Sequence, residues 1–147
     1  MKKITFRLFS IAMLLASSMV VKAEVIEATV GDLNYAIDTE LKEATVMWGE
    51  YEGFTDLVIP ANVNYEGVDY AVTGIDEDAF SSIESITSVT LPNTLVTIGA
   101  GAFSYCSLTS VTIPASVESI GEEAFWAFSL EAFKVDSDNS VYCDIDG

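Results

Sequence analysis

The sequence predicts a β-rich solenoid, in which coils of 22–23 residues combine short strands with one helical or 3₁₀ turn. Three observations favour this fold class. Residues 89–110 and 111–132 are identical at nine aligned positions. A proline, a glycine and an Ala-Phe pair recur in register, as at Pro114, Gly121 and Ala124–Phe125. Polar and apolar residues alternate before each proline, which is the period of a half-buried strand.

Each coil is expected to open with a strand that stops at its proline. In "SVTIP", Val111 and Ile113 would point toward the core, whereas Ser110 and Thr112 would point outward. Pro114 has no N–H and therefore ends strand pairing. The next stretch, "VESIG", predicts a second short strand.

The rest of each coil is expected to turn. Gly121 would adopt a left-handed conformation, and its counterparts Gly99 and Asp76 are residue types that tolerate positive φ. "EEAF" then predicts one helical or 3₁₀ turn that buries Ala124 and Phe125.

Stacking of the coils would explain the repeated aromatic residue. An earlier copy lies 23 residues before the copy at 89–110, so Phe80, Phe103 and Phe125 would align in one column. A single coil cannot bury such a ring, and neighbouring coils must supply the contacts. A partial last copy starts at Phe133 and soon leaves the pattern.

The repeats divide the chain into a solenoid, residues 57–147, and an N-terminal β cap, residues 24–56. In the cap, "LNYAID" and "EATVMWG" alternate like strands, and "VNYEGVDYAV" after it is typical of a hairpin turning near Glu66–Gly67. The chain stops at Gly147 with no obvious closing cap. Either its last segment folds over the open edge or the array is truncated, and the few copies favour truncation.

The first 23 residues are typical of a signal peptide. Lys2, Lys3 and Arg7 precede an apolar run of 14 residues, and the small residues of "VKA" end at Ala23. A membrane anchor is the alternative, but the run is shorter than the ~20 residues that a spanning helix needs. We therefore expect an exported bacterial protein that keeps no transmembrane helix after signal cleavage.

The motif "LTSVTIPASVESIGEEAF" resembles the leucine-rich repeats of BspA-like proteins, and the resemblance covers about residues 57–143. That family consists of exported or surface proteins of bacteria and some protists. The resemblance implies a secreted or cell-surface location and a binding role in adhesion. It implies as partners an extracellular or host protein, a glycan or another cell surface, and no catalytic activity defines the family.

The charge of the exported chain limits the kinds of partner that it can bind. After removal of residues 1–23, Lys42 and Lys134 are the only basic residues against 23 acidic ones. Such a surface repels nucleic acid and anionic lipid. It suits a basic partner or bound cations, and it also serves solubility alone.

The outward face of the first strands is one candidate binding surface. Ser88, Ser110 and Ala132 would form one column, and Thr90, Thr112 and Lys134 the next. Aligned small polar residues on stacked strands give the extended surface that solenoids use for binding. The alternative is that Ser and Thr merely suit exposed strand positions.

Trp126 and Tyr105 are further candidates, because the copies disagree at their positions. Trp126 matches Ser81 and Ser104, which we expect to be exposed. A tryptophan there either packs against a neighbouring loop or is presented to a partner. The same two alternatives apply to Tyr105.

Cys106, a lone cysteine within the repeats, suggests a catalytic nucleophile, but the aligned copies argue against that role. Its counterparts Ile83 and Phe128 are apolar, which predicts a buried site where a thiol behaves as a small hydrophobe. The chain has no histidine to activate it. A disulfide with Cys143 is left open.

A calcium site is suggested by the acidic C-terminal segment, which contains Asp136, Asp138, Asp144 and Asp146. The pattern fails because Val141 and Gly147 stand where a calcium loop needs glycine and glutamate. Turn formation by Asp and Asn explains the segment better, and we expect no metal site.

The sequence as a whole predicts a non-catalytic binding module for adhesion or protein–protein interaction. One alternative is a structural spacer within a longer surface protein. Another is an acidic glycoside hydrolase, since carboxylate pairs such as Glu122 and Glu123 can do acid–base work. No metal motif, nucleophile elbow or phosphate loop is present, so we expect no catalytic residue and no cofactor.

Overall fold

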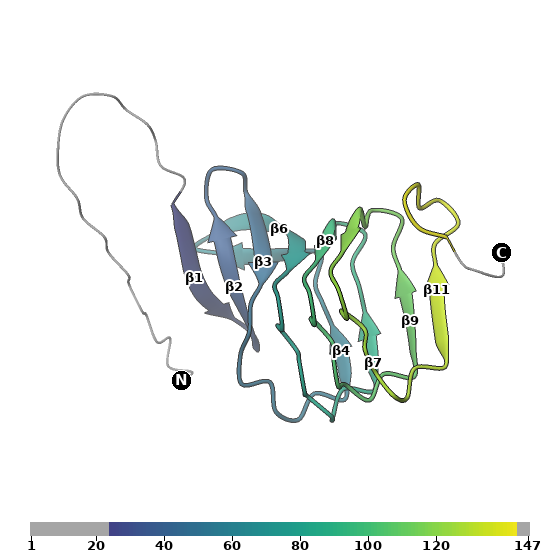
Figure 1. Ribbon diagram of the computed structural model, residues 1–147. Helices are drawn as coiled ribbons and strands as arrows, with labels where there is room; N and C mark the ends of the chain where they lie inside the picture. The colour runs from purple at the N-terminus through teal and green to yellow at the C-terminus, as the bar shows by residue number, and fades with distance from the viewer. Residues whose placement is uncertain (1–23, 144–147) are drawn as a thin grey trace.

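The computed structural model describes residues 24–143, which form eleven strands and no helix (Figure 1). The expected signal peptide, residues 1–23, and residues 144–147 lie outside this range. The strands are β1 (Val25–Val30), β2 (Leu33–Asp38), β3 (Glu43–Val46), β4 (Asp56–Val58), β5 (Asn62–Tyr65), β6 (Val68–Ile75), β7 (Ser88–Thr90), β8 (Thr97–Ile98), β9 (Ser110–Ile113), β10 (Ser119–Ile120) and β11 (Ala132–Val135).

The strands fall into two sets along the molecule (Figure 1). One sheet has the order β1-β2-β3-β6-β8-β10, with β5 also paired to β6. The other set consists of two parallel pairs, β4–β7 and β9–β11, between which the Thr109 N–H donates to the Thr87 carbonyl at 3.4 Å. The pairing joins residues one coil apart, as Thr112 with Lys134. The period in the sequence is therefore the step between neighbouring coils.

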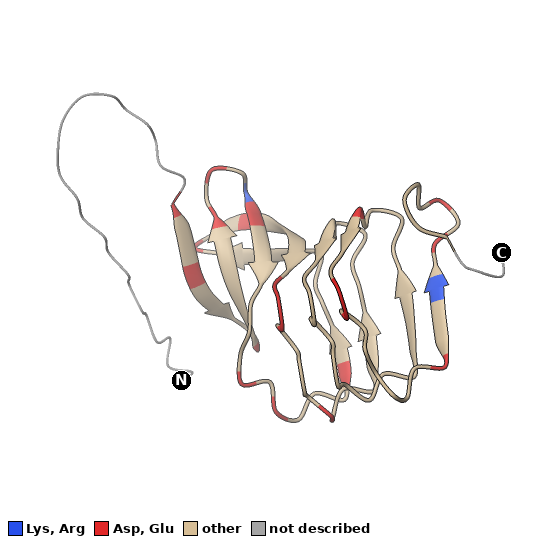
Figure 2. Cartoon of the chain, viewed as in Figure 1, with Lys and Arg blue, Asp and Glu red and all other residues tan. Residues whose placement is uncertain are grey.

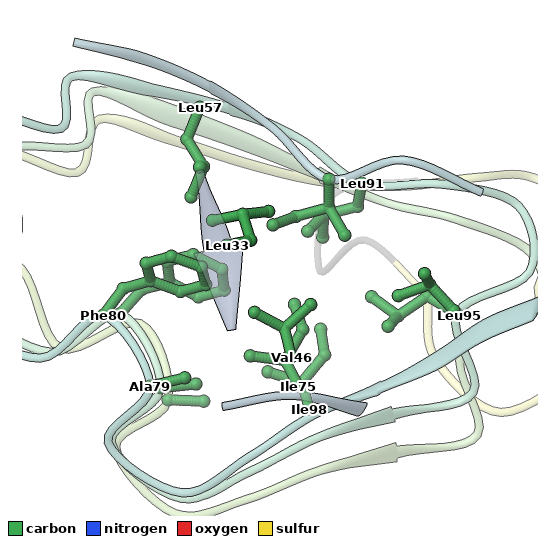
Figure 3. Close-up of a cluster of buried hydrophobic side chains, with 14 of the residues drawn as sticks. Leu33, Val46, Leu57, Ile75, Ala79, Phe80, Leu91, Leu95 and Ile98 are labelled. Atoms are coloured by element: carbon green, nitrogen blue, oxygen red, sulfur yellow. The ribbon is translucent and has the colours of Figure 1, made fainter. Parts of the chain in front are cut away.

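A column of aromatic rings fills one side of the interior. The ring centroids of Phe80 and Phe103 are 5.2 Å apart and those of Phe103 and Phe125 are 5.3 Å apart, with nearly parallel planes. Tyr51 continues the column beyond Phe80, and Phe133 meets Phe125 edge-on. Figure 3 shows the Phe80 ring in the same interior as layers of leucine, isoleucine and valine side chains. The predicted column exists, although Phe125 at its end is only partly buried.

The turn segments contain no helix, so the predicted helical or 3₁₀ turn is wrong. Two kinds of hydrogen bond alternate there. The Ser104 N–H donates to the Gly101 carbonyl of its own coil at 2.9 Å. The Phe103 N–H instead donates to the Ala124 carbonyl of the next coil at 2.7 Å. A helix would use each of these N–H groups internally, and the coil-to-coil bonds prevent it.

The glycine of each turn is needed for a different reason than expected. Gly99 and Gly121 do not have positive φ. A Cβ atom on Gly99 would lie 2.5 Å from the Glu77 nitrogen, and one on Gly121 would collide with the backbone of Ala100. Glycine therefore permits the close approach of two coils. The left-handed residues lie two positions later, in a column made of Asp78, Gly101 and Glu123.

Before the first coil, the sheet is extended by antiparallel strands. β1 pairs with β2 and β2 with β3, and β3 then pairs in parallel with β6. The strand patterns in "LNYAID" and "EATVMWG" correspond to β2 and β3, whereas β1 was not anticipated. β5 and β6 form the expected hairpin, with Glu66 at φ 51° and Gly67 at φ 82° in its turn.

After β11, the chain folds back against the last coil. The Asn139 side-chain amide donates to the carbonyls of Pro114 and Val117 at 2.8 and 3.0 Å. The Ile120 N–H donates to the Tyr142 hydroxyl at 3.0 Å. These side chains satisfy backbone groups at the edge next to β10.

Candidate binding surface

The five strand residues of the predicted binding face lie on β7, β9 and β11. All are exposed: Ser88, Thr90, Ser110, Thr112 and Lys134. Within the β9–β11 pair, Thr112 lies opposite Lys134 and Ser110 opposite Ala132. Between β7 and β9 the ladder is interrupted, so the columns run over two short sheets rather than one.

β4 adds two residues that the sequence analysis missed. Asp56 pairs with Ser88 and Val58 with Thr90, which lengthens both columns by one strand. The Ser88 hydroxyl donates to an Asp56 carboxylate oxygen at 2.6 Å. The "IP" of this copy, Ile59–Pro60, is visible in the sequence, but an insertion after it lengthens the step from 22 to 32 residues and obscures which residues pair with Ser88 and Thr90.

The charge of this face changes along the stack. Figure 2 shows an acidic residue on β4 at one end and a basic residue on β11 at the other. These are Asp56 and Lys134. Thr90 and Thr112 lie on the two strands between them, so the centre of the face is small and uncharged.

Trp126 lies at the end of a column in which Ser104 is buried and Ser81 is partly buried. Ser104 is only 6% exposed, and its hydroxyl is 2.9 Å from that of Ser81. The expectation that both serines are exposed is therefore wrong: neighbouring coils cover them. Trp126 has no further coil beside it in residues 24–143 and is 52% exposed.

Tyr105 is exposed as well, and its ring centroid is 6.4 Å from that of Phe128. Tyr105 and Trp126 lie on the turn segments, and in the described part of the chain no hydrogen bond or ring contact joins them to side chains of β7 or β9. The structure thus divides the predicted residues into a strand surface and a turn surface.

The turn surface contains an acidic hollow of about 400 Å³ that the sequence analysis also missed. Glu77 and Asp78 line one side, and Glu122 and Glu123 line the other. Between them, the coil at Ala100–Gly101 carries no acidic residue. The aligned copies contain this signal, because acidic residues flank one uncharged coil at the same positions.

Cys106 is 4% exposed, and its thiol donates to the Phe80 carbonyl at 3.1 Å. Burial raises the pKa of this thiol to about 11, so it stays protonated at neutral pH. Cys143 is exposed, and neither cysteine is in a disulfide. Cys106 is buried, as its apolar counterparts predict, whereas its counterpart Phe128 is 89% exposed in the last coil.

The acidic C-terminal segment forms a turn where the structure describes it. The Asp138 N–H donates to an Asp136 carboxylate oxygen at 2.9 Å, as in turns formed by Asp. The other two candidate ligands, Asp144 and Asp146, lie outside the described residues. Among residues 24–143, no three Cys, Asp or Glu side chains are grouped as a metal site would require. The same residues hold no helix with the length and apolar character of a membrane span.

Comparison with known proteins agrees with this architecture. The family model described as "BspA type Leucine rich repeat region (6 copies)" matches residues 54–143. The crystal structure of a leucine-rich repeat protein from Bacteroides capillosus is 30% identical, with a TM-score of 0.60, and the match covers 76% of this chain and 99% of that one. No curated protein matches the chain.

Two further solved structures are less similar. A leucine-rich repeat protein from Bacteroides ovatus is 23% identical, with a TM-score of 0.36, over 71% of this chain and 40% of that one. A leucine rich cell surface protein from Faecalibacterium prausnitzii is 17% identical, with a TM-score of 0.32, over 84% and 57%. The match of the family model to residues 54–143 and the 30% identity to the first structure show that the chain belongs to the BspA-type leucine-rich repeat family.

Proposed function

We propose that this protein is a non-catalytic binding module, secreted or held at the cell surface, whose strand surface contacts an extracellular or host protein, a glycan or another cell surface. The observation that carries the proposal is the set of exposed columns over β4, β7, β9 and β11. Side chains in register on rigid strands are held in place before binding, which lowers the entropy lost on association. Membership of the BspA-type family supports a binding role.

The same proposal assigns the parts of the chain. Residues 1–23 act as a signal peptide, residues 24–56 cap the first coil, and residues 57–147 form a solenoid. The antiparallel strands β1 to β3 support the cap, because they continue the sheet at β6 and leave no open edge there.

A binding experiment on residues 24–147 tests the strand surface. The chain is passed over immobilised extracellular matrix proteins and a glycan array. The triple variant Thr90→Ala, Thr112→Ala and Lys134→Gln should then bind its ligand at least tenfold more weakly, with an unchanged unfolding curve. The matched control changes the same kinds of residue elsewhere, Thr97→Ala, Ser119→Ala and Lys42→Gln, all of them exposed away from the strand surface.

The possible results distinguish a binding module from a structural spacer and from an enzyme. Equal binding by the triple and control variants would show that the strand surface is not the site. No retention on any ligand would favour the alternative of a structural spacer. Hydrolysis of a glycan that is lost in Glu123→Gln would overturn the non-catalytic assignment.

A further inference from the structure

A second candidate site lies outside the repeats, around Trp48. Two adjoining hollows of about 340 and 540 Å³ meet at this side chain, which lies in the loop after β3. Their polar lining comes from β1, β2, the turn between them and the loop after β3: Glu27, Thr29, Asp32, Asn34 and Glu50. We name this region the Trp48 hollow.

The indole is presented by a backbone that is held on both sides. Trp48 is 66% exposed. Its carbonyl accepts from the Asn34 side-chain amide at 3.2 Å, while the carbonyl of Met47 accepts from the Tyr51 hydroxyl at 2.6 Å. The Met47 N–H donates to the Asn34 carbonyl at 2.9 Å. Folding alone does not require a tryptophan at a fixed, exposed position, whereas a binding platform does.

The polar partners of the platform are also positioned in advance. The Thr29 hydroxyl donates to the Asn34 side-chain oxygen at 2.7 Å, which fixes the orientation of that amide. A Cβ atom on Gly49 would lie 2.6 Å from the Asn34 side-chain nitrogen and 2.7 Å from the Tyr51 ring. Only glycine allows the loop to pass this closely, so the arrangement of Trp48 beside Asn34 depends on Gly49.

The charge around the indole selects the kind of ligand. Glu27, Asp32 and Glu50 line the Trp48 hollow, and no lysine or arginine does. Lys42 and Lys134, the two basic residues of the described chain, lie elsewhere. Figure 2 shows the acidic residues on β1 and the neighbouring loops. A cation over an indole face is attracted by the ring, and carboxylates at its rim add to that attraction.

We propose that the Trp48 hollow binds a lysine or arginine side chain of a partner protein. The cationic group lies on the indole face, and Glu27 and Glu50 neutralise its charge from the rim. A neutral sugar could also stack on the indole, but it would leave the carboxylates uncompensated. This site is separate from the strand surface, and neither assignment depends on the other.

A fluorescence titration tests the proposal. The chain contains two tryptophans, so Trp126→Phe leaves Trp48 as the only indole reporter in residues 24–147. The probes are a blocked peptide with two arginines, the same peptide with citrulline, and a neutral oligosaccharide. The arginine peptide should shift the Trp48 emission, should bind roughly tenfold more tightly than the citrulline peptide, and should weaken as salt is added.

Variants separate the platform from general charge attraction, and their binding is followed by calorimetry. Trp48→Ala should weaken the arginine peptide roughly tenfold, while Trp48→Phe keeps part of the affinity. Glu27→Gln with Glu50→Gln should weaken it further than the matched pair Glu84→Gln with Glu118→Gln, two exposed carboxylates outside the hollow. Equal affinity of Trp48→Ala and the parent chain would overturn the proposal. So would a preference for the oligosaccharide.

Discussion

The coils at residues 89–110 and 111–132 share nine of 22 aligned residues but have different surroundings. Phe103 is fully buried between two rings, whereas Phe125 is partly buried and has an edge-on contact from Phe133. Cys106 is buried, whereas Phe128, its counterpart, is the most exposed large apolar residue of the described chain. In this protein, the neighbouring coil decides whether a side chain is buried.

The comparison also explains where the two coils differ in sequence. Ser104 lies between coils, where only a small side chain fits and its hydroxyl can meet that of Ser81. Trp126 occupies the same position in the last coil and is not confined in this way. An aromatic residue at the end of the stack is therefore compatible with the fold, whereas it would force two inner coils apart.

The largest difference between the coils should appear in their phenylalanines. Phe103→Ala removes a ring that is packed on both faces and should lower the free energy of unfolding by about 3–5 kcal/mol. Phe125→Ala should cost clearly less, because its ring is already partly exposed. Urea unfolding followed by circular dichroism measures both. Equal losses would mean that the last coil is as well packed as the inner one.

A smaller effect is expected where the coils approach each other at glycine. Gly99→Ala places a Cβ atom against the backbone of the preceding coil and should cost about 1–3 kcal/mol. Asp76 occupies the matching position in the first coil and already carries a side chain there, whose carboxylate accepts from the Glu77 N–H at 2.9 Å. Asp76→Ala should therefore cost less than Gly99→Ala in the same unfolding experiment. The reverse order would contradict the close-approach explanation.

The smallest expected effect concerns the two cysteines, one buried and one exposed. In the folded chain, burial raises the pKa of the Cys106 thiol from 9.0 to about 11, so the thiol ionises at a higher pH than in the unfolded chain. The stability due to this site is thus complete below pH 9 and falls as the pH rises toward 11, by about 1 kcal/mol at pH 10.

Cys106→Ala should remove that part of the pH dependence, as measured by urea unfolding at several pH values. Cys143→Ala is the matched control, because Cys143 is exposed. In the native protein, a thiol reagent should modify Cys143 rapidly and Cys106 only on unfolding. Rapid modification of both would show that the inner coil opens.

The sequence alone determined the features that depend on local patterns. The repeat step, the inward positions of Val111 and Ile113, the hairpin at Glu66–Gly67 and the resemblance to BspA-like repeats all follow from the order of residue types. Each has a local physical cause, such as the alternation of a strand or the φ that a hairpin turn requires. The structure agrees with these features.

Only the tertiary structure decided what depends on the neighbouring coil. Hydrogen bonds between coils replaced the expected helical turn, and backbone contact rather than positive φ explained Gly99. The position of a coil in the stack buried Ser104 and exposed Phe128, although the aligned copies suggested the opposite for each. The sequence does not single out Trp48, because Glu27 and Asn34, which line the same hollow, are distant from it in the sequence and come near it only when β1, β2 and β3 pair. The repeat sequence determines which side chains each coil can bury, but the contacts between stacked coils determine which of them are buried.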